Sequence, residues 1–234
     1  MRYQDIELHI AGEGKSMLLL HGWGMDATML EPLFLHFSKT YRVCSLDLPG
    51  FGKSAEPPYP YSIYDYVNVV KTIVRDFSLE DPIIIAHSFG ARIAFRYAAL
   101  FPVSFLIISG GAGIKPPRNF AYYMQIAWYK TLRFLHIQNQ LGSKDYRNAS
   151  LIMRSTLVKA VNDDVSDAIQ EIEAPILLVW GDKDEQTPLW MAEKICRLNE
   201  NASLVVFKND DHFACFHQMN RFINVCEAAL KGGK

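Results

Sequence analysis

A serine, an aspartate and a histidine of this chain have the side-chain types that acyl transfer needs. Ser88 lies in the segment Ala-His-Ser-Phe-Gly at 86–90, a small-x-Ser-x-Gly pattern. Asp184 and His212 follow it, each in a stretch whose glycine, asparagine or aspartate content is typical of a loop. An imidazole that takes the hydroxyl proton makes the serine a nucleophile, and a carboxylate holds that imidazole in the required tautomer. We therefore predict Ser88 as the nucleophile, His212 as the base and Asp184 as the acid.

The residues around Ser88 predict a sharp turn from a strand into a helix. The run Ile83–Ile85 is β-branched and typical of a buried parallel strand. From Gly90 onward the apolar spacing becomes helical, up to Phe101. Small residues at Ala86 and Gly90 suit a crowded turn that presents the hydroxyl at the positive end of the helix. An ordinary turn, with Ser88 as the N-cap of the helix, is the alternative.

A glycine-rich loop offers the backbone donors that an oxyanion needs. The apolar strand Met17–Leu20 runs into His-Gly-Trp-Gly at 21–24. Glycines on both sides of Trp23 let its backbone N–H approach a ligand closely. The N–H groups of Trp23 and Phe89 are therefore our predicted oxyanion hole. His21 shapes this loop and is also a candidate substrate contact, although a plain glycine-rich connection is the alternative.

Apolar runs alternate with helical patterns along most of the chain. Besides the strands already named, the pattern predicts strands at Asp5–Ala11 (an edge strand), Arg42–Leu46, Phe105–Ile108, Pro175–Trp180 and Leu204–Phe207. Between Ala112 and Ala174 the alternation stops and only helical patterns remain. We predict an α/β fold with a mostly parallel central sheet, helices on both faces and a short helical cap inserted after the sixth strand. The core would be 1–111 and 175–234, the cap 112–174, within a single domain overall.

The predicted cap carries a strong excess of positive charge. Between Ala112 and Asn162 there are eight lysines and arginines and a single acid, Asp145, in a chain of net charge −1. A solvated helix face normally mixes both signs, so the imbalance favours an anionic ester or an acidic acyl carrier as partner. A purely solvated face is the alternative. The candidate substrate contacts are Arg92, Arg118, Tyr123, Trp128 and Arg154.

Composition excludes several other classes of protein. A hydrophobic fraction of 50% and a charged fraction of 21% are ordinary for a globular chain, and the net charge of −1 argues against nucleic-acid binding. No apolar run approaches the roughly 18 residues of a membrane span, and the N-terminus lacks a signal-peptide layout. Four cysteines without C-x-x-C spacing indicate free thiols in a cytoplasmic protein. We expect a monomer or homodimer.

Taken together, these motifs resemble the α/β-hydrolase superfamily over nearly all of the chain outside the cap. The resemblance is carried by His-Gly-Trp-Gly at 21–24, Asp-Leu-Pro-Gly-Phe-Gly-Lys-Ser at 47–54, the Ser88 turn, Gly-Asp-Lys-Asp at 181–184 with Pro188, and His212-Phe213. The chain departs from the family at Ala86, Ala91 and Asp211, where glycine is commoner. An extra carboxylate at Asp211 would either raise the basicity of His212 or shift its loop.

The resemblance implies a fold that hosts many chemistries, so function has three readings. The first is a hydrolase of a small carboxylic ester or thioester, acting through an acyl-enzyme without metal or organic cofactor. The second is a lyase resembling the menaquinone-pathway synthase that eliminates pyruvate, which also has an arginine four residues after the nucleophile, here Arg92. The third is a non-catalytic ligand-binding receptor of the same fold.

Overall fold

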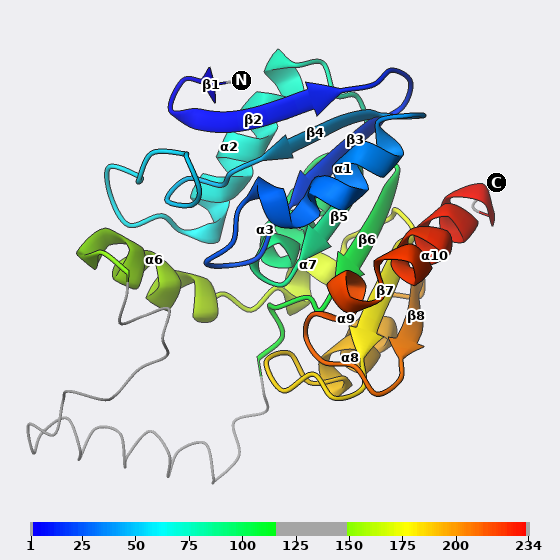
Figure 1. The fold of residues 1–234 in the computed structure, drawn as a ribbon. Helices are drawn as coiled ribbons and strands as arrows, with labels where there is room; N and C mark the ends of the chain where they lie inside the picture. Colours follow the sequence, from blue (N-terminus) through cyan, green and yellow to red (C-terminus); the bar gives the residue numbers. More distant parts are fainter. Residues whose placement is uncertain (1, 116–148, 233–234) are drawn as a thin grey trace, which may run out of the picture.

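The computed structural model describes residues 2–115 and 149–232 of the chain (Figure 1). In these residues eight strands form one sheet in the order β1-β2-β4-β3-β5-β6-β7-β8. The first two strands run antiparallel to their neighbours and the others are parallel. The strands are β1 (Arg2–Tyr3), β2 (Ile6–Ala11), β3 (Ser16–Leu20), β4 (Arg42–Leu46), β5 (Ile83–His87), β6 (Phe105–Ser109), β7 (Ile176–Gly181) and β8 (Ala202–Phe207).

Uninterrupted apolar runs form the central strands because both faces of the sheet are buried. On β3, Leu18 and Leu20 pack into one core, whereas Met17 and Leu19 pack into the other. A parallel sheet covered on both faces requires such runs. The predicted mostly parallel sheet is confirmed, but the predicted edge strand is wrong in one respect: β1 pairs with β2 and takes the outer position.

Helices cover both faces of the sheet, as predicted (Figure 1). One core is closed by α2 (Ile63–Asp76), α3 (Phe89–Ala98), α7 (Ser166–Gln170) and α8 (Trp190–Leu198). The other is closed by the 3₁₀ helix η1 (Ala27–Leu30), α1 (Glu31–Phe37), α9 (Ala214–His217) and α10 (Met219–Gly232). The N-terminus of α2 shows why the sequence starts a helix there: Ser62 and Asp65 form a reciprocal capping box.

The predicted cap lies partly outside the described residues. Of its described part, Leu151–Val161 forms α6 and Ser166–Gln170 forms α7. The stretches on either side of 116–148 meet, because Val165 N donates to the Gly113 carbonyl at 3.0 Å. Three of the predicted substrate contacts, Arg118, Tyr123 and Trp128, lie outside the described residues, and the boundaries 112–174 stay a prediction.

Arg96 ties this region to the core. From α3, its guanidinium donates to Asp163 at 2.9 Å and to Asp167 at 2.7 Å, and it also reaches the Asp164 carbonyl. Arg96 is only 7% exposed, so these bonds satisfy a buried charge. The helix that follows Ser88 is thereby fixed to the segment that follows α6.

The described residues also bear on the predicted membrane spans and cysteines. None of their helices is long and apolar enough to cross a membrane. Cys44, Cys196, Cys215 and Cys226 are free thiols, and all but Cys196 are buried.

Candidate active site

The turn between β5 and α3 holds Ser88 in a strained backbone conformation. Its φ of 50° and ψ of −111° are rarely adopted by a residue with a side chain. Ser88 N donates to the Ser109 carbonyl and Ala112 N donates to the Ser88 carbonyl, both at 3.0 Å, which anchors the turn to the end of β6. A Cβ at Gly90 would lie 2.6 Å from the Leu20 carbonyl oxygen, so only glycine fits there.

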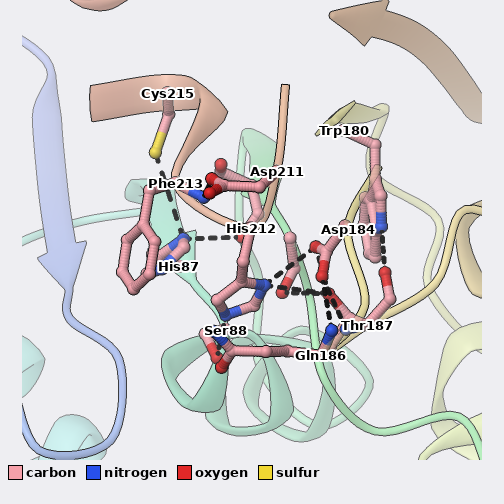
Figure 2. A network of polar contacts seen from close by, with 12 residues as sticks. His87, Ser88, Trp180, Asp184, Gln186, Thr187, Asp211, His212, Phe213 and Cys215 are labelled. Atoms are coloured by element: carbon pink, nitrogen blue, oxygen red, sulfur yellow. Dashed lines mark hydrogen bonds and ion pairs between the residues drawn. The ribbon is translucent and has the colours of Figure 1, made fainter. Parts of the chain in front are cut away.

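The Ser88 hydroxyl does not cap α3. Instead it lies 2.9 Å from His212 Nε2, and His212 Nδ1 lies 2.8 Å from Asp184 Oδ2 (Figure 2). The three residues follow β5, β7 and β8, whose carboxyl ends share one edge of the parallel sheet. This arrangement can carry a proton from the serine oxygen to the imidazole while the carboxylate stabilises the resulting charge. Ser88 thus occupies the N-cap position of α3, but its hydroxyl makes no capping bond to the helix.

Asp184 is 4% exposed and has four hydrogen-bond donors. Oδ1 accepts from the backbone N–H groups of Gln186 at 2.9 Å and Thr187 at 2.8 Å. Oδ2 accepts from the Thr187 hydroxyl at 2.7 Å as well as from His212. Burial by itself would raise the pKa of Asp184, but the bonds from His212 and Thr187 outweigh it and hold the pKa below its ordinary value.

The loop that carries His212 is held by Asp210. The Asp210 carboxylate accepts from His217 Nδ1 and from Gln218 Nε2, both at 2.7 Å. Its backbone carbonyl accepts from Lys183 N at 2.9 Å, which links the histidine loop to the Asp184 loop. Asp210, Asp211 and His217 are the one group of described residues whose ligand atoms lie close enough for a metal ion, and they bond to one another and to the helix that follows.

Asp211 does not contact the imidazole that it precedes in any bond described. Its carboxylate accepts from Phe213 N at 2.8 Å and lies 3.6 Å from His217 Nδ1. The extra acid therefore caps the turn that leads into α9. Of the two effects expected for it, the structure favours a role in shaping the loop.

His87 packs directly against His212, with ring centroids 4.8 Å apart. Its Nδ1 donates to the Ser109 carbonyl at 3.0 Å, whereas Nε2 is buried and has no hydrogen-bond partner in the described part of the chain. Burial, assisted by the neighbouring His212, lowers the pKa of His87 to about 3. His87 is thus a neutral ring packed against the imidazole of His212. Figure 2 shows the two side chains next to each other.

The predicted oxyanion loop lies beside the Ser88 turn. A Cβ at Gly22 would lie 3.3 Å from the Ser88 Cβ, and the rings of Trp23 and Phe89 meet edge to face with centroids 5.2 Å apart. Phe51 completes this aromatic cluster, 4.9 Å from the Trp23 ring. Close backbone approach of the two loops is what an oxyanion hole between them requires.

His21 does not face a substrate, contrary to our expectation. It is fully buried, with Nδ1 donating to the Gly22 carbonyl at 2.7 Å and Nε2 accepting from Leu48 N at 2.9 Å. Burial lowers the pKa of His21, which keeps the ring neutral so that Nε2 can accept. Its role is to join the 21–24 loop to the loop that begins at Asp47.

Two predicted arginine contacts lie in described helices. Arg92 Nη1 donates to the Asp163 carbonyl at 2.5 Å, and burial lowers the pKa of Arg92 to about 10. Arg92 thus joins Arg96 in fixing α3 to the segment after α6, which is a structural contact that its sequence position did not predict. Arg154 lies on α6.

Sequence reasoning missed Thr187 and Asp47. Thr187 lies three residues after Asp184, a spacing at which a threonine can bond back to an aspartate in a turn. Asp47 directly follows β4, and its two carboxylate oxygens accept from Ala27 N and Lys53 N, each at 2.8 Å. The sequence signal that could have indicated them is the loop each belongs to: Asp47 precedes Pro49 and Gly50, and Thr187 precedes Pro188.

Known proteins resemble this chain in sequence and in fold. Residues 17–224 match the family model described as the alpha/beta hydrolase family. A pimeloyl-[acyl-carrier protein] methyl ester esterase of Aliivibrio fischeri (strain ATCC 700601 / ES114) is 25% identical over 242 residues, which cover 91% of this chain and 92% of that protein.

Two solved structures illustrate the likeness in fold. An esterase from Exiguobacterium antarcticum has a TM-score of 0.77 at 20% identity, covering 97% of this chain and 96% of the esterase. MenH from S. aureus has a TM-score of 0.75 at 19% identity, covering 99% of each chain. At such identities these neighbours establish the shared fold.

Proposed function

Because the chain belongs to the alpha/beta hydrolase family, we propose that it cleaves a small carboxylic ester or thioester through a serine-bound acyl intermediate. The enzyme class predicted from the sequence, an α/β hydrolase acting on ester bonds, is confirmed. The observation that carries the more specific proposal is the unbroken Ser88–His212–Asp184 chain, with heavy-atom distances of 2.9 and 2.8 Å.

In the first half of the proposed reaction, the Ser88 oxygen attacks the substrate carbonyl carbon while His212 Nε2 takes the hydroxyl proton. Asp184 stabilises the imidazolium that forms. The backbone N–H groups of Trp23 and Phe89 bind the oxyanion, a contribution of about 3–4 kcal/mol for each donor in comparable sites.

The second half of the reaction releases the acyl group. His212 gives its proton to the leaving alcohol or thiol, which departs as the carbonyl reforms. A water molecule then transfers a proton to His212 and attacks the acyl carbonyl carbon. The bond from that carbon to the Ser88 oxygen breaks, His212 returns the proton to this oxygen, and the carboxylic acid is released. The proposed steps use side chains and backbone N–H groups of this chain, together with one water molecule.

The substrate we propose carries a negative charge on a part of the molecule other than the ester group. Relatives named as pimeloyl-[acyl-carrier protein] methyl ester esterases support an acyl group borne by an acyl carrier. The excess of lysine and arginine between Ala112 and Asn162 supports an anionic or acidic partner. Two of these cations in the described residues, Lys115 and Lys159, donate to the backbone carbonyls of Asn162 and Pro60.

A fluorophosphonate probe tests the proposed nucleophile, and p-nitrophenyl esters of graded chain length test the substrate. We expect covalent labelling at Ser88, and turnover of esters with a distal carboxylate that exceeds turnover of neutral esters at low salt. At 0.1 M salt, charges separated by more than about 10 Å are largely screened from each other, so this preference should fade as the salt concentration rises. Absence of labelling would favour the receptor reading, and labelling without ester turnover would favour the lyase. A ratio of anionic to neutral turnover that ignores salt would overturn the anionic substrate alone.

A further inference from the structure

The hydroxyl of Thr187 lies at the centre of the bonds that hold the acid and the base. Thr187 is 5% exposed, and its Oγ1 lies 2.7 Å from Asp184 Oδ2, 3.2 Å from His212 Nδ1 and 3.1 Å from the Gly110 carbonyl oxygen. Figure 2 shows it beside the Asp184–His212 contact. One side chain therefore contacts the acid, the base and the loop after β6.

A threonine hydroxyl has one hydrogen, so it can donate to only one of these contacts at a time and must accept in the others or leave them unbonded. The carboxylate of Asp184 and the carbonyl of Gly110 can only accept, whereas His212 Nδ1–H can only donate when its Nε2 is free to act as a base. The contact to Asp184 Oδ2 is the shorter one and its acceptor is charged, so the Thr187 hydroxyl donates its hydrogen to that oxygen. The Thr187 oxygen can then accept weakly from His212 Nδ1–H.

The rest of Thr187 is fixed independently of its hydroxyl. Its N–H donates to Asp184 Oδ1, and its carbonyl accepts from Trp180 Nε1 at 2.6 Å. Trp180 is fully buried, so this bond anchors Thr187 to β7. The hydroxyl is therefore held where it is by the backbone, and it can restrain the carboxylate that it contacts.

We propose that Thr187 is a positioning residue of the reaction proposed above, on which this inference rests. Its hydroxyl fixes the Asp184 carboxylate so that Oδ2 faces His212 Nδ1–H, and it draws off part of the negative charge that the imidazole experiences. Without the hydroxyl, Oδ2 carries more charge and rotates more freely. His212 would then hold its acid proton more tightly and would be aligned with Ser88 less often.

Within residues 2–115 and 149–232, the imidazole of His212 contacts two titratable side chains. Asp184 contacts Nδ1 from the loop after β7, and His87 packs on the ring face from the end of β5. His87 stays neutral through the range in which an esterase works, because burial keeps its pKa at about 3. A change in the acid limb of the rate profile can therefore be traced to the Asp184–Thr187 side of the ring.

The test compares Thr187→Val with Thr187→Ser by the pH dependence of ester hydrolysis. Valine keeps the shape and removes the hydroxyl, whereas serine keeps the hydroxyl. For Thr187→Val we expect kcat to fall about tenfold with little change in KM, since a hydrogen bond to a charged group is lost. We also expect the acid limb of kcat/KM to move upward by about half a pH unit to one unit. Thr187→Ser should recover most of the rate and restore the limb.

Thr156→Val is the matched control. Thr156 is buried like Thr187, and its hydroxyl oxygen accepts from Tyr61 N at 3.0 Å, a bond that involves neither Asp184 nor His212. It should lower stability without moving the acid limb. A rate loss in Thr187→Val with the limb unmoved would reduce Thr187 to a packing residue and overturn the proposal, as would unchanged kinetics.

Fluorophosphonate labelling keeps this outcome separate from the wider proposal. The labelling rate of the wild-type chain, followed against pH, reports the activation of Ser88 without any ester. If the wild-type chain is not labelled, the proposed function fails. If it is labelled and Thr187→Val is labelled at the same rate with the same pH dependence, only the role of Thr187 fails.

Discussion

Two loops at the same edge of the sheet each bury an aspartate, but the two carboxylates differ in the donors that they accept from. Asp47 follows β4 and Asp184 follows β7, and they are 5% and 4% exposed. Both oxygens of Asp47 accept from backbone N–H groups, those of Ala27 and Lys53. Asp184 uses one oxygen for backbone donors and leaves the other, Oδ2, to side chains.

Neither burial nor position after a strand therefore decides the role of a buried acid. The role of the acid depends on which groups donate hydrogen bonds to its two carboxylate oxygens. A carboxylate saturated by the backbone stabilises a loop, whereas one with an oxygen left for an imidazole can orient a base. Substitutions at each end of the Asp184 network and at Asp47 test this distinction.

The largest effect is expected at the far end of the Asp184 network. Ser88→Ala and His212→Ala should each lower kcat by about 10⁶, and the double variant should lose little more, because the residues act as a unit. Ester turnover by the purified variants measures the loss, with circular dichroism to check that the fold is intact. Turnover near the wild-type level in Ser88→Ala would end the acyl-enzyme account.

A smaller loss is expected from Asp184→Asn, about 10⁴ in kcat. The amide would place an N–H₂ group against His212 Nδ1 and favour the wrong imidazole tautomer. Asp182→Asn is the control from the same loop, since Asp182 is exposed and its carboxylate bonds only to Asn209 N among the described contacts. If Asp182→Asn were the damaging change, the acid would be wrongly assigned.

The smallest effect on activity is expected from Asp47→Asn, which should instead reduce stability. An amide supplies one accepting oxygen where the backbone needs two, so one N–H group loses its partner at a cost of about 1–3 kcal/mol. For a chain of this size each kcal/mol lowers Tm by roughly 2–4 °C. Thermal unfolding and the labelling rate of Ser88 should separate the two aspartates. A slowed labelling rate at unchanged Tm would contradict the assignment of Asp47 to structure.

The sequence sufficed for the elements that carry the proposed site. Ser88, Asp184 and His212 each follow an apolar run that the structure confirms as a parallel strand, and parallel strands bring their carboxyl ends to one edge. The crowded turn predicts a small residue at position 90, and the structure gives the reason: a Cβ there would clash with the Leu20 carbonyl oxygen. Local patterns predict such features because the constraint acts within a few residues.

Features set by distant contacts could not be predicted in this way. The hydroxyl of Thr187 meets Gly110 and His212, which are 77 and 25 residues away in the chain. His21 was expected to touch substrate because of its type, but the N–H of Leu48, 27 residues later, occupies the ring nitrogen that would do so. Arg92 is similarly engaged by the carbonyl of Asp163. Residue type alone cannot reveal a partner of this kind.

The backbone conformation of Ser88 has a consequence for how this protein can change over generations. Every residue except glycine is strained at a φ of 50° and ψ of −111°, by about 1–3 kcal/mol, and glycine adopts such conformations readily. A mutation to glycine at this position would therefore make the fold more robust while removing the hydroxyl. Selection for stability favours glycine at this position, whereas selection for turnover favours serine. A more heat-resistant form of the chain therefore has to gain its stability at other positions.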